Sequence, residues 1–341
     1  MLRLPAFKYE TPDTIKAAAE LLQADPDNTR LVAGGTDLWP NMKRRHQSAE
    51  TVVSLHRIKG VFGITSSEDG GFEIGAMTTL ADILKNSDLC RAYAGFGRAV
   101  QSVSSMPLRN TGTIGGNLCL DTRCTYLNQG EEWRRSIDYC LKERGETCWV
   151  APGSTRCWAI SSSDTAPYLC AIGARVRLSS ASGEREIDLT DLYVEDGIDY
   201  LAKKRDEILT HVILPASTAA SSTYWKLRRR GSIDFPVLGV ACSVMVDDAG
   251  VVTEASIFLG AVASSPIPAT AAADSLIGKP FAEDAIVAAA TLARKPSTPL
   301  ENTDYMATWR KTMVERYVAG ALRELAGLEP GVKAPPGFAV Q

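Results

Sequence analysis

The sequence predicts an α+β protein with more than one domain. At 341 residues the chain is longer than one hydrophobic core usually supports, and its 45% apolar and 23% charged residues are ordinary for a globular protein. Helix and strand patterns alternate through the first part, and strand patterns followed by two helices end the chain. We therefore expect one domain over residues 1–215, a second α+β domain over 216–330 and a tail over 331–341.

Charge and cysteine content narrow the class of protein further. The net charge of −3 is spread along the chain and leaves no basic face, so neither nucleic acid nor a membrane is an expected partner. Met1 to Pro5 lack the apolar core of a signal peptide, which favours a cytoplasmic location. Because cytoplasmic thiols stay reduced, the eight cysteines are expected to be metal ligands or buried small side chains.

The first helix is expected to have Thr11 as its cap and Pro12 at its first position. Helical spacing predicts a buried stripe formed by Ile15, Ala18, Ala19 and Leu22. Short strands are expected at 30–33 and 51–55.

The middle of the chain continues with a strand at 72–76 and helices at 80–84 and 92–103. Residues 105–117 are rich in Gly, Thr, Asn and Pro without periodicity, which predicts a long functional loop. Between 119 and 158 only 131–142 looks helical, so this stretch is interpreted as an insertion. Later elements are expected at 166–178, 207–214, 239–246 and 254–261, with closing helices at 284–294 and 305–325.

Two glycine-rich loops, at 33–37 and 113–117, are candidates for binding a diphosphate. Glycine lets the backbone approach a phosphate closely, and the hydroxyls of Thr36 and Thr113 add possible donors. Neither loop matches the GxGxxG or Walker A pattern, so a Rossmann site or P-loop is not indicated. The alternative is that both loops are simply tight turns.

Five cysteines lie within 39 residues, and four of them are separated by sixteen, eight and nine residues: Cys124, Cys140, Cys148 and Cys157. Four thiolates suit a [4Fe–4S] cluster or a structural zinc. Zinc sites usually contain a C-x₂₋₄-C pair, which these four lack, although Cys119 would supply one with Cys124. Three interpretations therefore remain open: an iron–sulfur cluster, a zinc site, and cysteines that bind no metal or form disulfides.

Other polar residues give weaker signals. Lys226 follows two aromatic residues and is either a cation beside an electron-rich ring or part of a solvated basic run. Asp121 and Asp164 flank the insertion, and solvation is the default for both. The histidines are too scattered to form a metal site or a catalytic triad.

Three motifs in order, at 31–38, 74–80 and 109–118, resemble the FAD-binding subunit of the xanthine dehydrogenase and carbon monoxide dehydrogenase family. The resemblance implies a two-subdomain FAD-binding fold of the vanillyl-alcohol oxidase (PCMH) type, followed by a C-terminal α+β flavoprotein domain. It also implies FAD contacts from Leu31, Val32, Ala33, Gly34, Gly35, Thr36, Asp37, Leu38, Thr78, Thr113, Ile114, Gly115, Gly116, Asn117, Asp164 and Lys226.

The family usually runs from the second loop almost directly into a Ser-x-x-Asp stretch, which here appears only at 161–164. The cysteine-rich insertion, 122–160, is similar to the one in the beta subunit of 4-hydroxybenzoyl-CoA reductase, where four cysteines bind a [4Fe–4S] cluster. This resemblance assigns Cys124, Cys140, Cys148 and Cys157 as the ligands.

The resemblance implies an electron-transfer subunit with FAD and a [4Fe–4S] cluster. The chain has no molybdopterin-binding sequence and no plant-type C-x₄-C-x₂-C pattern, so a molybdopterin-binding large subunit and a [2Fe–2S] small subunit are expected partners. With a ferredoxin-like donor or acceptor, the complex would dehydroxylate an aromatic acyl-CoA. The alternatives are the FAD subunit of a hydroxylating molybdenum dehydrogenase and a zinc-stabilised binding module without redox work.

Overall fold

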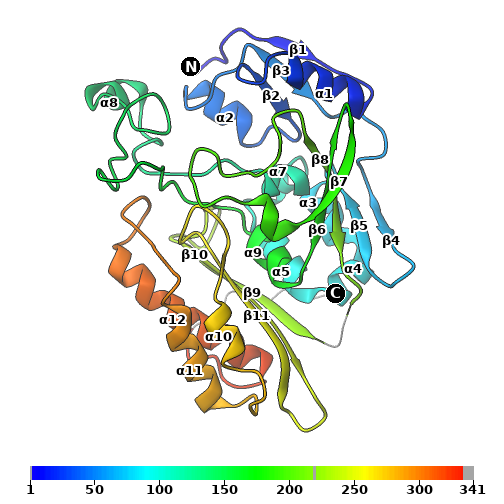
Figure 1. Cartoon of the computed structure of the whole chain (residues 1–341), viewed down its shortest axis with the longest axis vertical. Helices are drawn as coiled ribbons and strands as arrows, with labels where there is room; N and C mark the ends of the chain where they lie inside the picture. Colours follow the sequence, from blue (N-terminus) through cyan, green and yellow to red (C-terminus); the bar gives the residue numbers. More distant parts are fainter. Residues whose placement is uncertain (1, 218–219, 333–341) are drawn as a thin grey trace.

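The computed structural model describes residues 2–217 and 220–332, which form three sheets with helices packed around them (Figure 1). The predicted tail, 331–341, lies outside the described residues from 333 onward. No helix in the described ranges is long and apolar enough to span a bilayer. The α+β class predicted from the sequence is confirmed.

The first sheet is parallel, with strand order β1-β3-β2. Its elements are β1 (Lys8–Glu10), α1 (Ile15–Ala24), β2 (Thr29–Val32), α2 (Leu38–Lys43) and β3 (Thr51–Ser54). Helix α1 buries Ala18, Ala19 and Leu22, as its spacing predicts. The predicted cap is wrong, because the hydroxyl of Thr14 rather than Thr11 accepts the N–H of Ala17, at 3.2 Å.

The second sheet is antiparallel, with strand order β4-β5-β8-β6-β7. Its strands are β4 (Ile64–Ser66), β5 (Phe72–Gly75), β6 (Arg175–Ser180), β7 (Gly183–Asp188) and β8 (Ile208–Leu214). Around it lie α3 (Leu80–Lys85), α4 (Ser87–Ala92), α5 (Ala94–Ser102), α9 (Thr165–Ala171) and the 3₁₀ turn η1 (Leu189–Leu192). Buried residues of these strands and helices belong to one apolar core.

The predicted long loop at 105–117 contains two short helices, α6 (Met106–Arg109) and α7 (Ile114–Leu118). The prediction of an irregular loop is therefore wrong in part. Helices this short show no apolar period, and α7 depends on a cap, since the hydroxyl of Thr113 accepts the N–H of Gly116 at 3.1 Å.

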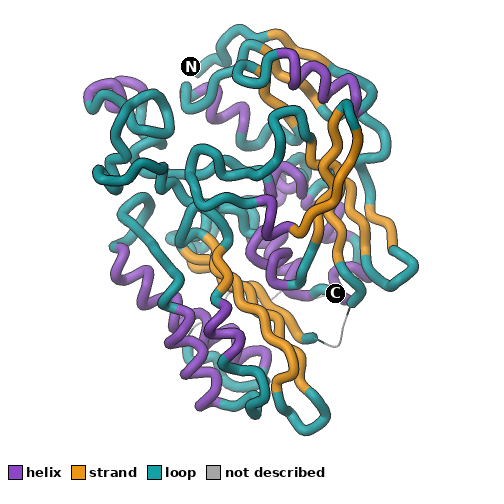
Figure 2. The backbone as a smooth tube through the Cα atoms, in the orientation of Figure 1, coloured by secondary structure: helices purple, strands orange, loops and turns teal. Residues whose placement is uncertain are grey.

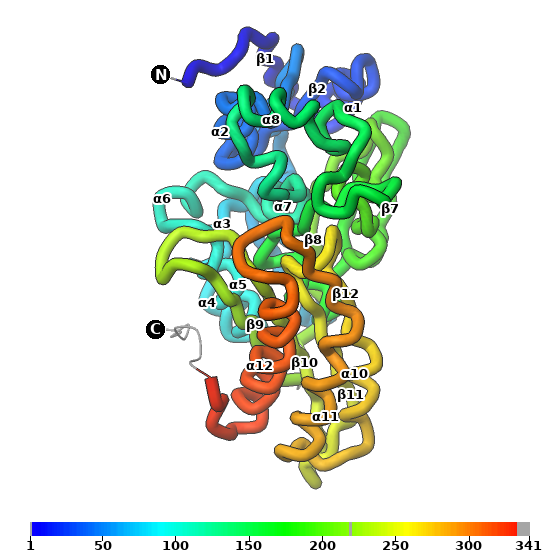
Figure 3. The backbone as a smooth tube through the Cα atoms, turned by 90° about the vertical axis from the view of Figure 1, so that its left-hand side faces the viewer, coloured from blue at the N-terminus to red at the C-terminus, as the bar shows by residue number. Residues whose placement is uncertain are grey.

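The cysteine segment, which the sequence predicts to be an insertion, runs between α7 and α9, and Figure 2 shows it mostly as loop. Its one helix, α8 (Glu131–Ser136), is shorter than the predicted 131–142. Asp138 and Tyr139 have φ of 56° and 61°, a left-handed backbone that ends a helix. Figures 1 and 3 both place α8 next to α2.

The third sheet is antiparallel, with order β12-β11-β10-β9. Its strands are β9 (Ser221–Leu227), β10 (Leu238–Val246), β11 (Val252–Gly260) and β12 (Ile267–Pro268), and its helices are α10 (Thr270–Asp274), α11 (Glu283–Ala293) and α12 (Ala307–Leu325). Helices α10 and α12 contact the sheet, and α5 and α9 of the second unit contact it as well. This double coverage explains the nearly continuous apolar run of β10.

Candidate functional site

The first glycine loop connects β2 to α2 and has open backbone donors. Within the described residues, the N–H groups of Gly35, Thr36 and Asp37 form no hydrogen bond. Gly35 has a φ of +69°, and a Cβ there would lie 2.1 Å from Nε1 of Trp39. Open amides in a glycine turn are the kind of donor that a diphosphate accepts from, and the diphosphate site expected at this loop stays a prediction.

Most backbone donors of the second glycine loop are already bonded within the protein. The N–H groups of Ile114 and Gly115 bond to the carbonyls of Thr78 and Ala76, at 3.1 and 2.9 Å. Gly116 donates to the Thr113 hydroxyl, as described above. Ile114 and Gly115 therefore hold the loop to the residues that follow β5, whereas the N–H of Thr113 forms no hydrogen bond within the described residues.

The two loops pack directly against each other. A Cβ at Gly34 would lie 1.9 Å from the carbonyl oxygen of Thr111, and one at Gly112 would lie 3.5 Å from Oγ1 of Thr36. Only glycine at position 34 allows this approach. The structure thus brings together two sequence motifs that lie far apart in the chain.

Asn117 links the second loop to Asp164 across the whole insertion. Its Oδ1 accepts the hydroxyls of Ser163 and Thr165, at 2.7 and 2.6 Å. Asp164 lies between these residues at the start of α9 and is 3% exposed. These bonds fix the position of the Asp164 carboxylate relative to the loops.

Lys226 on β9 pairs with Asp164, with Nζ 2.8 Å from Oδ2, and its other two donors bond to the carbonyls of Ser102 and Asp234 at 2.9 and 2.7 Å. All three donors of the ammonium are thus used. Burial raises the pKa of Asp164, while Lys226 and the hydroxyl of Tyr224, 2.8 Å from Oδ1, oppose that shift. Lys226 is a buried, fully bonded cation, not part of a solvated run.

Arg123 connects the start of the insertion to the first glycine loop, a role that the sequence did not indicate. Its guanidinium pairs with Asp37 and lies 3.8 Å from the ring centroid of Phe235. Its backbone pairs with that of Ile160, with N–O distances of 2.9 and 2.8 Å. Burial raises the pKa of Asp37, an effect that Arg123 opposes and Asp121 reinforces.

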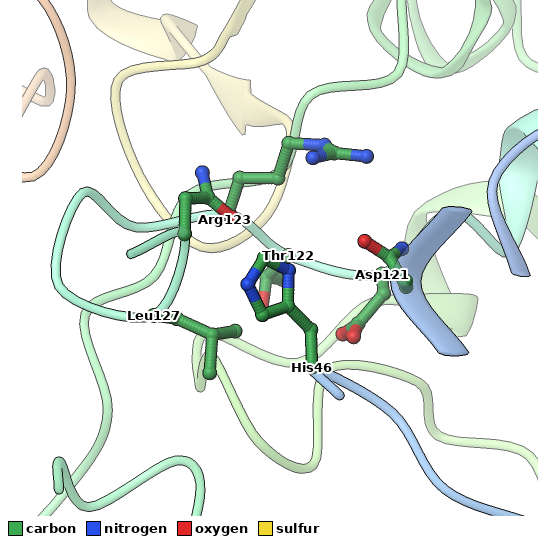
Figure 4. A pocket seen from close by; sticks show the side chains of 7 residues that line it. His46, Asp121, Thr122, Arg123 and Leu127 are labelled. Atoms are coloured by element: carbon green, nitrogen blue, oxygen red, sulfur yellow. The ribbon is translucent and has the colours of Figure 1, made fainter. Parts of the chain in front are cut away.

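A small cavity lies where the insertion meets the loop after α2. Figure 4 shows His46, Asp121, Thr122, Arg123 and Leu127 around it. Its volume of about 10 Å³ is near the minimum for one water. The cavity therefore belongs to the packing of the insertion against α2 and is too small for a cofactor.

The four cysteines predicted as ligands gather in space. Cys124, Cys140 and Cys157 share one apolar cluster with Leu127 and Ala159. Cys148 is 5% exposed and lies close enough to Cys140 and Cys157 for its charge to raise their pKa. Four residues separated along the chain thus converge inside the insertion.

Backbone N–H groups point at three of these sulfurs. Cys124 accepts from Tyr126 and Leu127, Cys140 accepts from Lys142 and Glu143, and Cys157 accepts from Ala159. Such bonds stabilise thiolates and tune iron–sulfur sites. Burial nevertheless raises the pKa of Cys124 to about 12 and that of Cys157 to about 11, so metal binding would displace protons.

Among the described residues, no group of three or more His, Cys, Asp or Glu side chains is arranged so that it holds a metal ion. A single tetrahedral zinc requires sulfurs only about 3.8 Å apart, given Zn–S bonds of about 2.3 Å. Both the zinc site and the cluster predicted from the resemblance therefore stay predictions.

A glycine loop with open amides, packed against a second glycine loop, is the kind of site that binds phosphate groups. The chain belongs to the family described as FAD binding domain in molybdopterin dehydrogenase, which matches residues 5–217. Residues 222–325 match the CO dehydrogenase flavoprotein C-terminal domain. The chain is thus an FAD-binding oxidoreductase subunit of the xanthine and CO dehydrogenase family, and the interpretation as a non-redox module is wrong.

Two of the relatives that match this chain are 30% identical to it. The nicotinate dehydrogenase FAD-subunit of Eubacterium barkeri aligns over 81% of this chain and 81% of its own length. The aldehyde oxidoreductase FAD-binding subunit PaoB of Escherichia coli K12 aligns over 77% of this chain and 83% of its own. A carbon monoxide dehydrogenase structure from Hydrogenophaga pseudoflava shares the fold, with a TM-score of 0.80, 24% identity and 95% and 99% coverage of the two chains.

Proposed function

We propose that this chain is the electron-transfer subunit of a molybdenum-containing complex, and that it holds FAD at the two glycine loops and a [4Fe–4S] cluster in the cysteine segment. The observation that carries the flavin assignment is the set of open amides at Gly35, Thr36 and Asp37. When bound, FAD exchanges two electrons with one partner and single electrons with another. We assign its diphosphate to the first loop, with Asp164 and Lys226 shaping the wall of the site.

The convergence of four buried thiols supports the cluster. Each thiolate of a [4Fe–4S] cluster binds a different iron, so the sulfurs stand further apart than around one zinc ion. Cys124, Cys140, Cys148 and Cys157 converge inside the cysteine segment and match in number the four thiolates that such a cluster needs.

We infer that partner subunits carry molybdopterin and [2Fe–2S] centres and that the complex works in the cytoplasm, where thiols such as the eight free cysteines here stay reduced. The names of the relatives, a nicotinate dehydrogenase subunit and an aldehyde oxidoreductase subunit, favour oxidation of a substrate on a partner. A second candidate is reductive dehydroxylation of an aromatic acyl-CoA such as 4-hydroxybenzoyl-CoA, which the cysteine segment favours. We also propose the boundaries 1–215 and 216–330 for the two domains.

Anaerobic purification with analysis of FAD, iron, acid-labile sulfide and zinc tests the cofactor assignment. We expect stoichiometric FAD, with iron and sulfide near four per chain for a [4Fe–4S] cluster. Cys140→Ser should remove the iron and its absorbance, whereas Cys119→Ser, at a half-buried cysteine outside the proposed ligand set, should retain both. Stoichiometric zinc without sulfide would overturn the cluster, and a chain without FAD would overturn the flavin site.

Assays of the purified complex distinguish substrate oxidation from reductive dehydroxylation. Oxidation of an N-heterocycle or aldehyde with reduction of the flavin supports the dehydrogenase. Dehydroxylation of 4-hydroxybenzoyl-CoA with a low-potential donor supports the reductase.

A further inference from the structure

Trp39, the second residue of α2, brings its indole N–H to the first glycine loop. A Cβ at Gly35 would lie 2.1 Å from Nε1 and 2.4 Å from Cδ1 of Trp39, so the edge of the indole that carries the N–H lies against this glycine. The backbone N–H of Trp39 also donates to the carbonyl of Gly35, at 3.3 Å. The sequence motif ends at Leu38, so this contact adds a residue that the sequence did not indicate.

The indole N–H of Trp39 is a donor without an acceptor. Across residues 2–217 and 220–332, Nε1 of Trp39 forms no hydrogen bond, and it is not one of the buried polar atoms that lack a partner. By contrast, the indoles of Trp158 and Trp225 donate to acceptors within the chain. Because an indole nitrogen can donate but not accept, Nε1 is open to an acceptor that binds at the loop.

A second contact holds the indole in this position. The ring of Phe7 stacks on that of Trp39, with centroids 5.6 Å apart and planes inclined by 23°. Both rings pack against the apolar cluster that contains Val32 of β2 and Val52 of β3. A side chain fixed between a stacked ring and a glycine loses little further conformational entropy when it donates to a ligand.

Neutral donors have to hold an anion at the first glycine loop. From Ala33 to Trp39 the sequence contains no Lys or Arg. Arg123 reaches this loop, but its guanidinium is paired with the Asp37 carboxylate. A diphosphate bound here therefore depends on N–H groups without charge, and a hydrogen bond from such a group to a charged oxygen is stronger than one between neutral groups.

We propose that the indole N–H of Trp39 is a further donor to the diphosphate of FAD, beside the open amides of Gly35, Thr36 and Asp37. This inference rests on the proposed function, because it needs a diphosphate at the first loop. Trp39 binds the cofactor and takes no part in electron transfer. Its N–H recognises the charged phosphate oxygens and not the flavin ring.

The test uses the full chain, freed of FAD and then titrated with FAD, riboflavin and ADP. Riboflavin has the flavin ring without phosphate, whereas ADP has a diphosphate without the flavin ring. Trp39→Phe keeps a ring between Phe7 and Gly35 but removes the N–H. We expect the affinities for FAD and ADP to fall about tenfold, as for the loss of one hydrogen bond to a charged group, and the affinity for riboflavin to change less than about twofold.

The matched control is Trp309→Phe, the same change at an indole on α12 that is 39% exposed and forms no hydrogen bond within the described ranges. It should leave all three affinities unchanged. If Trp39→Phe does not fold, 3-benzothienylalanine incorporated at position 39 replaces it. This analogue has the shape of Trp with sulfur in place of the indole N–H, and it should show the same loss for FAD and ADP.

Unchanged affinities for FAD and ADP would overturn the inference and leave the flavin site standing. A loss that is as large for riboflavin as for FAD would also overturn it, because Trp39 would then act through packing or through the flavin ring. A wild-type chain that binds neither FAD nor ADP would overturn the proposed function itself, so the two failures are distinguishable.

Discussion

The Nζ of Lys226 lies 2.8 Å from Oδ2 of Asp164, and their side chains are 2% and 5% exposed. Lys226 belongs to β9 of the third sheet, and Asp164 begins α9 of the second unit. The pair therefore holds the two parts of the molecule together beside the glycine loops.

Lys226→Met leaves the Asp164 carboxylate buried without its cation. Removing one member of a buried ion pair costs about 3–5 kcal/mol, so we expect that loss in the free energy of unfolding together with loss of FAD on purification. Urea denaturation and flavin absorbance measure both quantities. The double variant Lys226→Met/Asp164→Asn should recover part of the stability, because no unpaired charge remains.

The matched control for this prediction is Arg205→Ala, which breaks an exposed pair with Asp27 whose side chains are 73% and 75% exposed. Exposed pairs contribute about 0–1 kcal/mol. Equal losses for Lys226→Met and Arg205→Ala would contradict the structural role of the buried pair.

Gly34→Ala should separate the two glycine loops, because its Cβ would lie 1.9 Å from the carbonyl oxygen of Thr111. We expect FAD affinity to fall at least tenfold, about 1.4 kcal/mol, in a fluorescence titration. Gly153→Ala is the control, since nothing lies within 4 Å of its added Cβ. Unchanged affinity in Gly34→Ala would remove the first loop from the flavin site.

Arg123→Ala should weaken FAD binding through charge. It leaves the Asp37 carboxylate uncompensated next to the amides proposed for the diphosphate, and we expect about tenfold weaker binding, roughly 1.4 kcal/mol. The double variant Arg123→Ala/Asp37→Asn should recover most of the affinity. Phe235→Leu, which removes only the ring under the guanidinium, should cost about 0.5–1 kcal/mol of stability. If the double variant binds no better than Arg123→Ala, the effect is not electrostatic.

Glu324 should contribute to pH-dependent stability. Burial raises its pKa, but bonds from Arg98 and Trp225 lower it more, so the folded pKa lies below the ordinary 4.5. A carboxyl group whose pKa is lower in the folded state stabilises the fold at any pH above its pKa in the unfolded chain. This contribution disappears as the pH falls through the pKa of the folded state. The free energy of unfolding of Glu324→Gln should therefore be about 1.5–3 kcal/mol below that of the wild type at neutral pH. In strong acid the two values should approach each other.

Thermal unfolding from neutral pH down to about pH 3 measures this convergence. The control is Glu283→Gln, the same change at a carboxylate whose side chain is 52% exposed and pairs with Arg323. If the unfolding temperatures of Glu324→Gln and the wild type differed by the same amount at every pH, Glu324 would act through packing and not through its charge.

Periodic patterns predicted the regular elements well, because the buried stripe of α1 and the apolar run of β10 follow directly from burial on one or both faces. Boundaries were less predictable. Two threonines near the start of α1 can each cap a helix, and backbone geometry selects Thr14. The early end of α8 comes from left-handed residues at 138 and 139, which have no apolar signature.

The candidate site was predictable as motifs but not as contacts. The glycine loops are visible in the sequence, whereas the 1.9 Å approach of Gly34 to Thr111 depends on how distant segments fold. The pairing of Lys226 with Asp164 arises from sheet packing and was not expected. Arg123 was missed, and its position directly before Cys124 is the one sequence signal that points to it.

The paired backbones of Arg123 and Ile160 determine how the cysteine segment is attached to the rest of the chain. The chain leaves the flavin fold and returns to it at neighbouring positions, so everything between them forms a cassette. Residues 124–159 can therefore vary in length and sequence without changing the path of the flanking chain. The same geometry suggests a grafting experiment. When residues 124–159 are transplanted between the two corresponding positions of a related protein without such a segment, the fold of the host protein should stay intact.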